Sequence, residues 1–93
     1  MSKVYVIVEA DAEEACKVGV AANPYARLRE LQTANPRRLV LAYTSRELDK
    51  PTAHRVERTA HRALSDHRIR LEWFGCLPET AIVAVQDAGG FWR

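Results

Sequence analysis

The feature that most constrains the fold is a short strand followed closely by a helix start, at residues 16–28. The strand alternates apolar and polar positions, in the order Cys16, Lys17, Val18, Gly19, Val20. Asn23 and Pro24 then open a helix, because asparagine caps free amides and proline fits the first helical position. Arg27 follows about one turn in. Lys17 and Arg27 are therefore aimed from two rigid elements toward a glycine that permits close approach, an arrangement that suits a phosphate.

The N-terminal part predicts a β-hairpin. Residues 3–8 alternate and are rich in β-branched side chains, and residues 15–21 alternate in the same way after a polar turn. With the turn centred on Asp11, Tyr5 lies directly opposite Lys17, on the face away from the valines. A change of register by one residue separates the two side chains.

The remainder of the chain predicts three helices and one strand. The first helix covers residues 24–35, with Tyr25, Leu28 and Leu31 on its inner stripe, and Pro36 stops it. Residues 39–44 are almost continuously apolar, which predicts a strand buried on both faces at the centre of the sheet. The further elements are a helix from Asp49 to about His67, a connection over residues 69–74 with Trp73 and Phe74 filling the core, and a helix over residues 78–87 with Ala81, Ile82 and Val85 inward.

This order predicts an α/β (α+β) fold, in which a small three-stranded antiparallel sheet is flanked by helices in the order β-β-α-β-α-α. The 93 residues predict a single domain over 1–93, with its core at about 3–87 and a C-terminal tail at 88–93. Cys16 and Cys76 have no metal-finger spacing, and we expect buried thiols.

The second helix carries two stripes at helical spacing. The predicted buried stripe is Ala53, Val56, Ala60, Ala63 and Leu64. A neighbouring stripe is formed by His54, Glu57 and His61. Glu57 beside the apolar stripe needs a partner, which is either Arg58 or Arg62 in a surface ion pair or a metal ion.

Charge is unevenly placed although the net charge is only +2. Residues 27–70 carry ten arginines and Lys50 against five acids, whereas both ends are net acidic. Arginine suits bidentate phosphate contact, so this middle part could meet a polyanion, although a solvated helix face explains it equally well. Arg37 and Arg38 lie in a loop, where either role applies. No apolar run reaches the length of a membrane span, and no signal peptide is evident, so we expect a cytoplasmic location without a membrane partner.

Five motifs together resemble a known family. They are Val4-Tyr5-Val6-Ile7, Lys17-Val18-Gly19, Asn23-Pro24-x-x-Arg27-Leu28-x-x-Leu31-Gln32-Thr33-Ala34-Asn35-Pro36, Glu57-x-x-x-His61 and Glu72-Trp73-Phe74. In this order and spacing the chain resembles the GIY-YIG nuclease superfamily over about residues 3–87. It is most similar to the compact phage and bacterial branch, the T5orf172 or meiotically up-regulated gene 113 type.

The resemblance implies a metal-dependent endonuclease that hydrolyses phosphodiester bonds of DNA with one Mg²⁺ or Mn²⁺ ion. It implies that Tyr5 is the tyrosine of the first motif, Gly19 the structural glycine of the second, Arg27 the helix arginine and Glu57 the metal ligand. We further expect Lys17 and His61 to take part in catalysis, His61 by orienting Glu57 or holding a metal-bound water. For a helix histidine such as His61, a purely structural role stays open.

The chemistry assigns further roles at this site. Arg27 stabilises developing negative charge, and Tyr5 acts as general base or orients the water. The ordinary pKa of a tyrosine, about 10, is too high for easy base work. The predicted position of Lys17 opposite Tyr5 supplies a cation to lower it. Glu72 contacts Arg27 or lies on the surface.

The expected partner is a nucleic acid, for which we take DNA while the choice between DNA and RNA stays open. We expect a monomer or homodimer to bind it, with Arg29, Arg37 and Arg38 on the DNA. A bacterial cytoplasm, or that of a host if a phage encodes the chain, follows from the resemblance. Lys17 departs from the tyrosine usual in the second motif, and no asparagine follows Asn35, although the wider family has a late one. These departures leave two alternatives open: a catalytically weak or inactive nucleic-acid-binding adapter, and a zinc hydrolase built on the stripe around Glu57.

Overall fold

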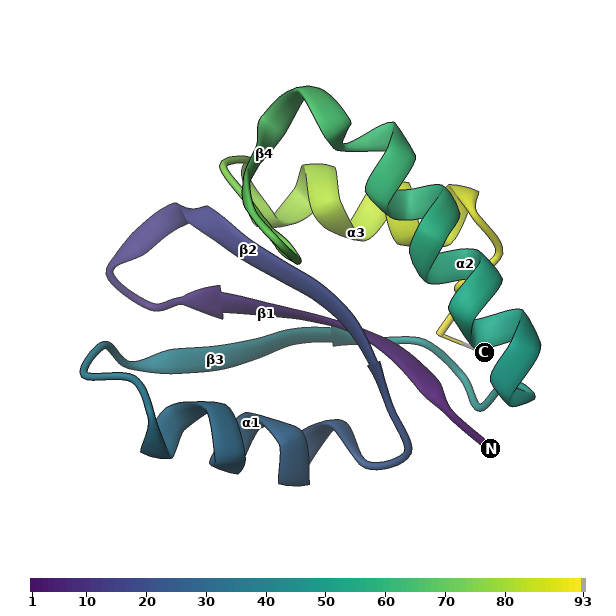
Figure 1. The fold of residues 1–93 in the computed structure, drawn as a ribbon, viewed down its shortest axis with the longest axis horizontal. Helices are drawn as coiled ribbons and strands as arrows, with labels where there is room; N and C mark the ends of the chain where they lie inside the picture. The colour runs from purple at the N-terminus through teal and green to yellow at the C-terminus, as the bar shows by residue number, and fades with distance from the viewer. Residues whose placement is uncertain (93) are drawn as a thin grey trace.

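The computed structural model describes residues 1–92, apart from the side chain of Glu13. Its elements, in chain order, are β1 (Lys3–Glu9), β2 (Ala12–Ala21), α1 (Pro24–Thr33), β3 (Leu39–Thr44), α2 (Lys50–Ala63), a short 3-10 helix (Ser65–His67), β4 (Arg68–Arg70), β5 (Trp73–Phe74) and α3 (Pro78–Asp87). One antiparallel sheet has α1 on one face and α2 with α3 on the other (Figure 1). The predicted fold class is confirmed. Arg93, the last residue of the predicted tail, lies outside the described residues.

The sheet has five strands, in the order β3-β1-β2-β5-β4, rather than the predicted three. The two additional strands come from the segment expected to be a plain connection. Trp73 of β5 pairs with Lys17 of β2, and Phe74 pairs with Cys16. Strands of two and three residues are too short to show a period of two, so only their long-range pairing reveals them.

The prediction that residues 39–44 form the central strand is wrong, because β3 lies at the edge of the sheet. Its long apolar run has another cause. The register of β3 against β1 shifts between Val6 and Ile7, so that Leu41 packs with the cluster under α1 while Tyr43 packs with the cluster on the opposite face. An irregularity in an edge strand thus imitates a strand that is buried on both faces.

The hairpin forms as predicted, but its register differs. Tyr5 lies opposite Gly19, and Lys17 lies opposite Ile7. The pairing shifts between Val8 and Glu9, so the turn does not lie symmetrically about Asp11. Because the displacement amounts to two residues along β2, Tyr5 and Lys17 keep the same face of the sheet while losing their direct opposition.

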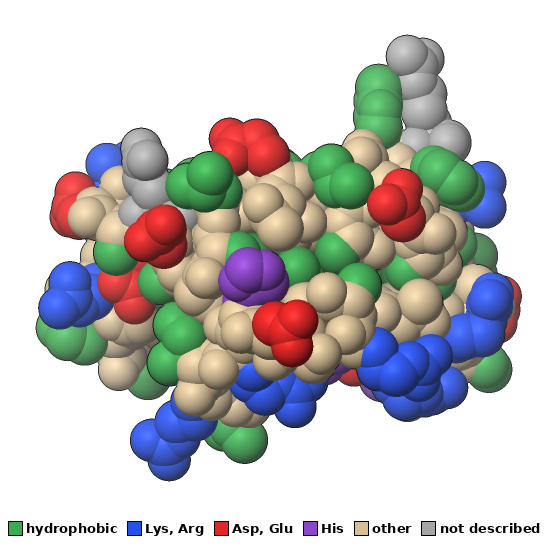
Figure 2. Space-filling model, turned by 90° about the horizontal axis from the view of Figure 1, so that it is seen from above, with side chains coloured by type: hydrophobic (Ala, Val, Ile, Leu, Met, Phe, Trp, Pro, Cys, Tyr) green, Lys and Arg blue, Asp and Glu red, His purple; other side chains and the backbone are tan. Residues whose placement is uncertain are grey.

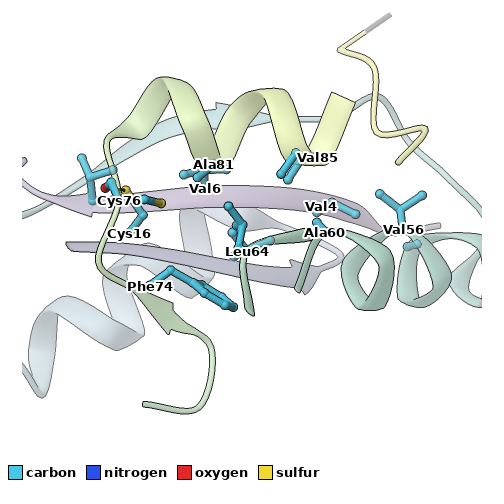
Figure 3. Close-up of a cluster of buried hydrophobic side chains, with 14 of the residues drawn as sticks. Val4, Val6, Cys16, Val56, Ala60, Leu64, Phe74, Cys76, Ala81 and Val85 are labelled. Carbon is cyan, nitrogen blue, oxygen red and sulfur yellow. Dashed lines mark hydrogen bonds between the residues drawn. The ribbon is translucent and has the colours of Figure 1, made fainter. Parts of the chain in front are cut away.

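The larger part of the core lies between the sheet and the helices α2 and α3, where alternate residues of β1 and β2 meet Val56, Ala60 and Val85 (Figure 3). Phe74 closes this cluster from β5, as predicted. Cys16 and Cys76 are buried free thiols, also as predicted, and the Cys16 thiol donates a hydrogen bond to the Cys76 carbonyl oxygen at 3.0 Å. A smaller cluster between the sheet and α1 contains Tyr5, Ile7, Ala21 and Leu39.

The helices begin where the sequence predicts. Asn23 accepts a hydrogen bond from the amide of Ala26 at 3.2 Å, and Asp49 caps α2 in the same way through Thr52. Tyr25 and Ala63 are exposed, so their predicted places on inner stripes are wrong. Among the described residues, none of the helices is long and apolar enough to cross a membrane.

Candidate functional site

The predicted catalytic residues lie around an open stretch of β2. The residue pairing of β5 with β2 covers Cys16 and Lys17, and the Val18 amide still donates a hydrogen bond to the Glu72 carbonyl oxygen at 3.1 Å. Beyond Val18, no strand in the described residues pairs with this side of β2, so the end of β2 nearest α1 has a free edge. Helix α1 starts directly after this edge on one face of the sheet, and α2 lies on the other (Figure 1). Arg27 of α1 and His54 of α2 line the same surface hollow. Side chains from both faces of the sheet therefore meet around this edge.

Tyr5 and Gly19 form the innermost contact. The Tyr5 side chain is fully buried, with 0% exposed, and its ring lies against the Gly19 backbone. A Cβ atom at position 19 would lie 2.6 Å from Tyr5 Cζ and closer still to the hydroxyl oxygen, a separation that real Cβ atoms do not show. Gly19 is therefore required by the phenol ring of Tyr5, which occupies the space that the sequence suggested for a phosphate.

The Tyr5 hydroxyl is held in its protonated form. Burial raises the pKa of Tyr5 to about 12, and the carboxylates of Glu72 and Glu57 add to the rise. Arg27 opposes it through its charge and a close approach of its side chain. That approach falls short of a well-formed hydrogen bond, since the buried hydroxyl has no hydrogen-bond partner within the described part of the chain. The predicted lowering by Lys17 is wrong, and Arg27 is the cation that acts on Tyr5.

Lys17 instead forms an ion pair with Glu72. Its Nζ lies 2.8 Å from Glu72 Oε1 and 5.9 Å from the centre of the Trp73 ring. The lysine side chain is 13% exposed, so the pair is partly shielded from water. In the described residues Glu72 pairs with Lys17 and not with Arg27, so the predicted contact with Arg27 is not formed. The Glu72 side chain is 40% exposed, which agrees with the predicted surface position. Lys17 holds the Glu72 carboxylate near the site.

Glu57 is a partly buried carboxylate with an unusual proton affinity. Its side chain is 14% exposed, and its Oε1 lies 4.0 Å from His54 Nδ1. Burial raises the pKa of Glu57, and the nearby Glu72 carboxylate raises it further, while His61, His54 and Lys17 oppose the rise. Neither Arg58 nor Arg62 forms the predicted ion pair with it among residues 1–92.

A partly buried carboxylate such as Glu57, which has no Lys or Arg ion pair in the described residues, is a group that fits a divalent cation. Mg²⁺ commonly takes one or two protein carboxylates and completes its shell with water and phosphate. Glu57 is the carboxylate in position, with Glu72 in electrostatic range. In the described residues no three His, Cys, Asp or Glu side chains gather closely enough to hold a metal ion together. The zinc site considered for His54, Glu57 and His61 is therefore not formed.

His61 attaches α2 to the free edge of β2. Its Nε2 lies 2.9 Å from the carbonyl oxygen of Val18, the first residue past the β5 pairing, and its ring packs on Phe74 at 5.1 Å between centroids. With the proton on Nε2, the imidazole donates to this carbonyl. His61 thus positions Glu57, one turn earlier on the same helix, against the strand.

Comparison with known protein families identifies this architecture. The T5orf172 domain family matches residues 2–88. The chain belongs to the T5orf172 family. This family is associated with the GIY-YIG-like nuclease fold, which points to a nuclease or another nucleic-acid-related function. A comparison with curated proteins gives no significant match, and a comparison with solved structures gives none either.

In this T5orf172 domain two of the three predicted DNA-binding arginines, Arg37 and Arg38, lie away from the site. Arg29 is exposed on α1, and Arg37 pairs with Glu9 at 3.7 Å, where β1 ends. The Arg38 carbonyl oxygen accepts a hydrogen bond from Ala10 in the hairpin turn at 2.9 Å. Arg37 and Arg38 therefore lie at the hairpin end of the sheet, whereas Arg27 and Glu57 lie at the other end.

The residue that sequence reasoning ranked too low is Glu72. Its signal was present, because Glu72 precedes an aromatic pair that is part of a recognised motif. Only the pairing of β5 with Lys17 shows that this motif brings a second carboxylate into electrostatic range of Glu57.

Proposed function

We propose that this T5orf172 domain is a metal-dependent endonuclease of the GIY-YIG type, which hydrolyses phosphodiester bonds of DNA. The observation that carries the proposal is the meeting of Tyr5, Arg27 and Glu57 around one free strand edge. The pKa of Tyr5 responds both to Arg27 and to Glu57, so the three side chains act on one another although they come from three elements.

Glu57 would hold the divalent cation, Mg²⁺ or Mn²⁺. A bound cation neutralises charge on the phosphate and lowers the pKa of water. Arg27 is 43% exposed at its side chain and pairs only loosely with Glu30, at 3.5 Å, so it is free to turn toward a phosphate and stabilise the developing negative charge.

Tyr5 acts first as a neutral phenol that orients the attacking water. A base role requires a lower pKa, and the groups that raise it are known: burial, Glu72 and Glu57. A cation that neutralises Glu57 and Glu72 would remove two of the three effects that raise the pKa of Tyr5, and burial would remain. Arg27 then opposes the remaining effect of burial and shifts the pKa of Tyr5 downward. Tyr5 would accept a proton from water only as the phenolate, after its own proton has passed to solvent.

The natural substrate class is DNA, bound by a cytoplasmic monomer or homodimer. The competing function is a nucleic-acid-binding adapter without catalysis. The complete burial of Tyr5 favours it, because a phenol that meets no solvent must first be uncovered to touch a water molecule. The missing late asparagine favours it as well.

Cleavage of supercoiled plasmid in the presence of Mg²⁺ or Mn²⁺ tests the proposal. The wild type is expected to nick the plasmid, and Glu57→Gln is expected to lose nicking because it no longer holds the cation. Glu79→Gln, an exposed carboxylate at the start of α3, is the matched control and keeps the wild-type rate. Equal nicking by Glu57→Gln contradicts the proposal. Salt-sensitive binding without any nicking supports the adapter instead.

A further inference from the structure

A second hollow lies beside the candidate site, on the far side of His61. It has a volume of about 460 Å³ and is lined by Arg58, His61, Arg62, Ser65 and Arg68. Its lining comes from α2, the 3-10 helix and β4, so the three arginines are brought together by the fold rather than by one helix. None of the described residues that line it is acidic.

The arginines of this hollow lack acidic partners. Within the described part of the chain, none of Arg58, Arg62 and Arg68 forms an ion pair. Arg62 donates only a long hydrogen bond to Thr59, at 3.4 Å, and Arg68 lies over the Phe74 ring at 5.3 Å. Arg58 and Arg62 are four residues apart on one helix, where like charges destabilise each other. An anion between them removes this repulsion.

The distance between this hollow and the candidate site indicates which kind of anion fits both. On helix α2, His54 lines the hollow that also contains Arg27, and His61 lines the hollow of the three arginines. Glu57 lies between these two histidines in the sequence of the helix. At 1.5 Å per residue, His54 and His61 are about 10 Å apart along the helix axis. One strand of duplex DNA carries a phosphate about every 3.4 Å along its axis, so this distance corresponds to about three phosphates.

We infer that the hollow of Arg58, Arg62 and Arg68 binds backbone phosphates of the nucleic-acid strand next to the phosphate at Glu57. This assigns the DNA path to the α2 and β4 side of the domain, rather than to Arg37 and Arg38 at the hairpin end. On the face shown in Figure 2, Lys and Arg side chains gather along the lower edge. The inference rests on the proposed function for the identity of the ligand, but its test does not need cleavage.

The test is the salt dependence of duplex binding, measured by fluorescence anisotropy in EDTA, where no metal-dependent cleavage takes place. Each neutralised phosphate contributes about 0.9 to the slope of log K against log salt concentration. The double variant Arg58→Gln/Arg62→Gln is expected to lower the slope by about 1.8, so its affinity loss between about 50 and 200 mM salt is about tenfold smaller than that of the wild type. Arg55→Gln, an exposed arginine on the same helix that does not line the hollow, is the matched control, with an unchanged slope.

Two further measurements test the contribution of β4 and the kind of phosphate that the hollow accepts. Arg68→Gln, from β4, is expected to lower the slope by about 0.9. Inorganic phosphate is expected to raise the melting temperature of the wild type and not that of the double variant if the hollow also accepts a free anion. If inorganic phosphate leaves the melting temperature of the wild type unchanged while the salt slope of the double variant still falls, the hollow binds only phosphates of a polynucleotide backbone. That result also supports the inference.

An unchanged slope in both variants overturns the inference. So does a fall of the slope in Arg37→Gln/Arg38→Gln alone, which places the DNA at the hairpin end. Plasmid nicking that persists with unchanged slopes leaves the proposed function standing and removes only this site. Lower slopes without any nicking keep the phosphate site and remove the catalytic function.

Discussion

Replacement of Tyr5 by phenylalanine separates stability from activity at the candidate site. The tyrosine hydroxyl is buried without a hydrogen-bond partner in the described residues. A buried polar group in this state costs about 1–3 kcal/mol. The approach of Arg27 offsets part of that cost. We therefore expect Tyr5→Phe to stabilise the domain by about 1 kcal/mol, which raises the melting temperature by about 4–8 °C in a domain of this size.

The same variant is expected to lose cleavage by about 10²- to 10⁴-fold, because phenylalanine cannot orient or deprotonate a water. Urea unfolding at pH 7 measures the first effect, and plasmid nicking with Mn²⁺ the second. A loss of stability of more than about 1 kcal/mol refutes the reasoning, since it means that the hydroxyl makes a hydrogen bond worth keeping. Full nicking activity in Tyr5→Phe refutes the catalytic role of the phenol.

Three other substitutions test the remaining contacts. Gly19→Ala is expected to cost about 1–3 kcal/mol in urea unfolding, because the new Cβ meets the Tyr5 ring; a cost near zero shows that the ring moves aside. Glu57→Gln removes a carboxylate whose pKa is raised by burial and by Glu72, so wild-type stability should fall relative to the variant as the pH rises above about 4.5. Melting temperatures of the wild type and Glu57→Gln, measured at a series of pH values around 4.5 and above, check this prediction. If the two melting temperatures change with pH in parallel, the prediction is contradicted. Lys17→Met removes a cation that lowers the pKa of Glu57, so the acidic limb of the pH–rate profile should move to higher pH; an unmoved limb excludes Lys17 from the electrostatics of the site.

Local patterns predicted the elements well where those elements are long and regular. The bounds of β3 and α3 follow directly from the apolar run at 39–44 and the helical spacing at 78–87. The position of β3 in the sheet does not follow, because an apolar run does not distinguish a strand buried on both faces from an edge strand with an irregular register. Strand β5 exists through pairing with β2, and β4 exists through pairing with β5. No local sequence signal records either pairing.

For the candidate site, the sequence predicted which residues lie near one another better than it predicted their pairings. Tyr5, Arg27 and Glu57 were found through motif spacing, and the fold brings them around one strand edge. The period of two correctly placed Tyr5 and Lys17 on one face. It could not reveal the register shift near Glu9, which moves Lys17 away from Tyr5 and toward Glu72. The electrostatics of the site therefore had to come from three-dimensional structure.

That Glu57 holds a divalent cation beside Tyr5 and Arg27 is tested most directly by anomalous scattering from crystals soaked with Mn²⁺. We predict one anomalous peak at the Glu57 carboxylate, within reach of both side chains, and its loss in crystals of Glu57→Gln. A peak held by other residues, or one that persists in Glu57→Gln, contradicts the assignment of this metal site and the nuclease mechanism built on it.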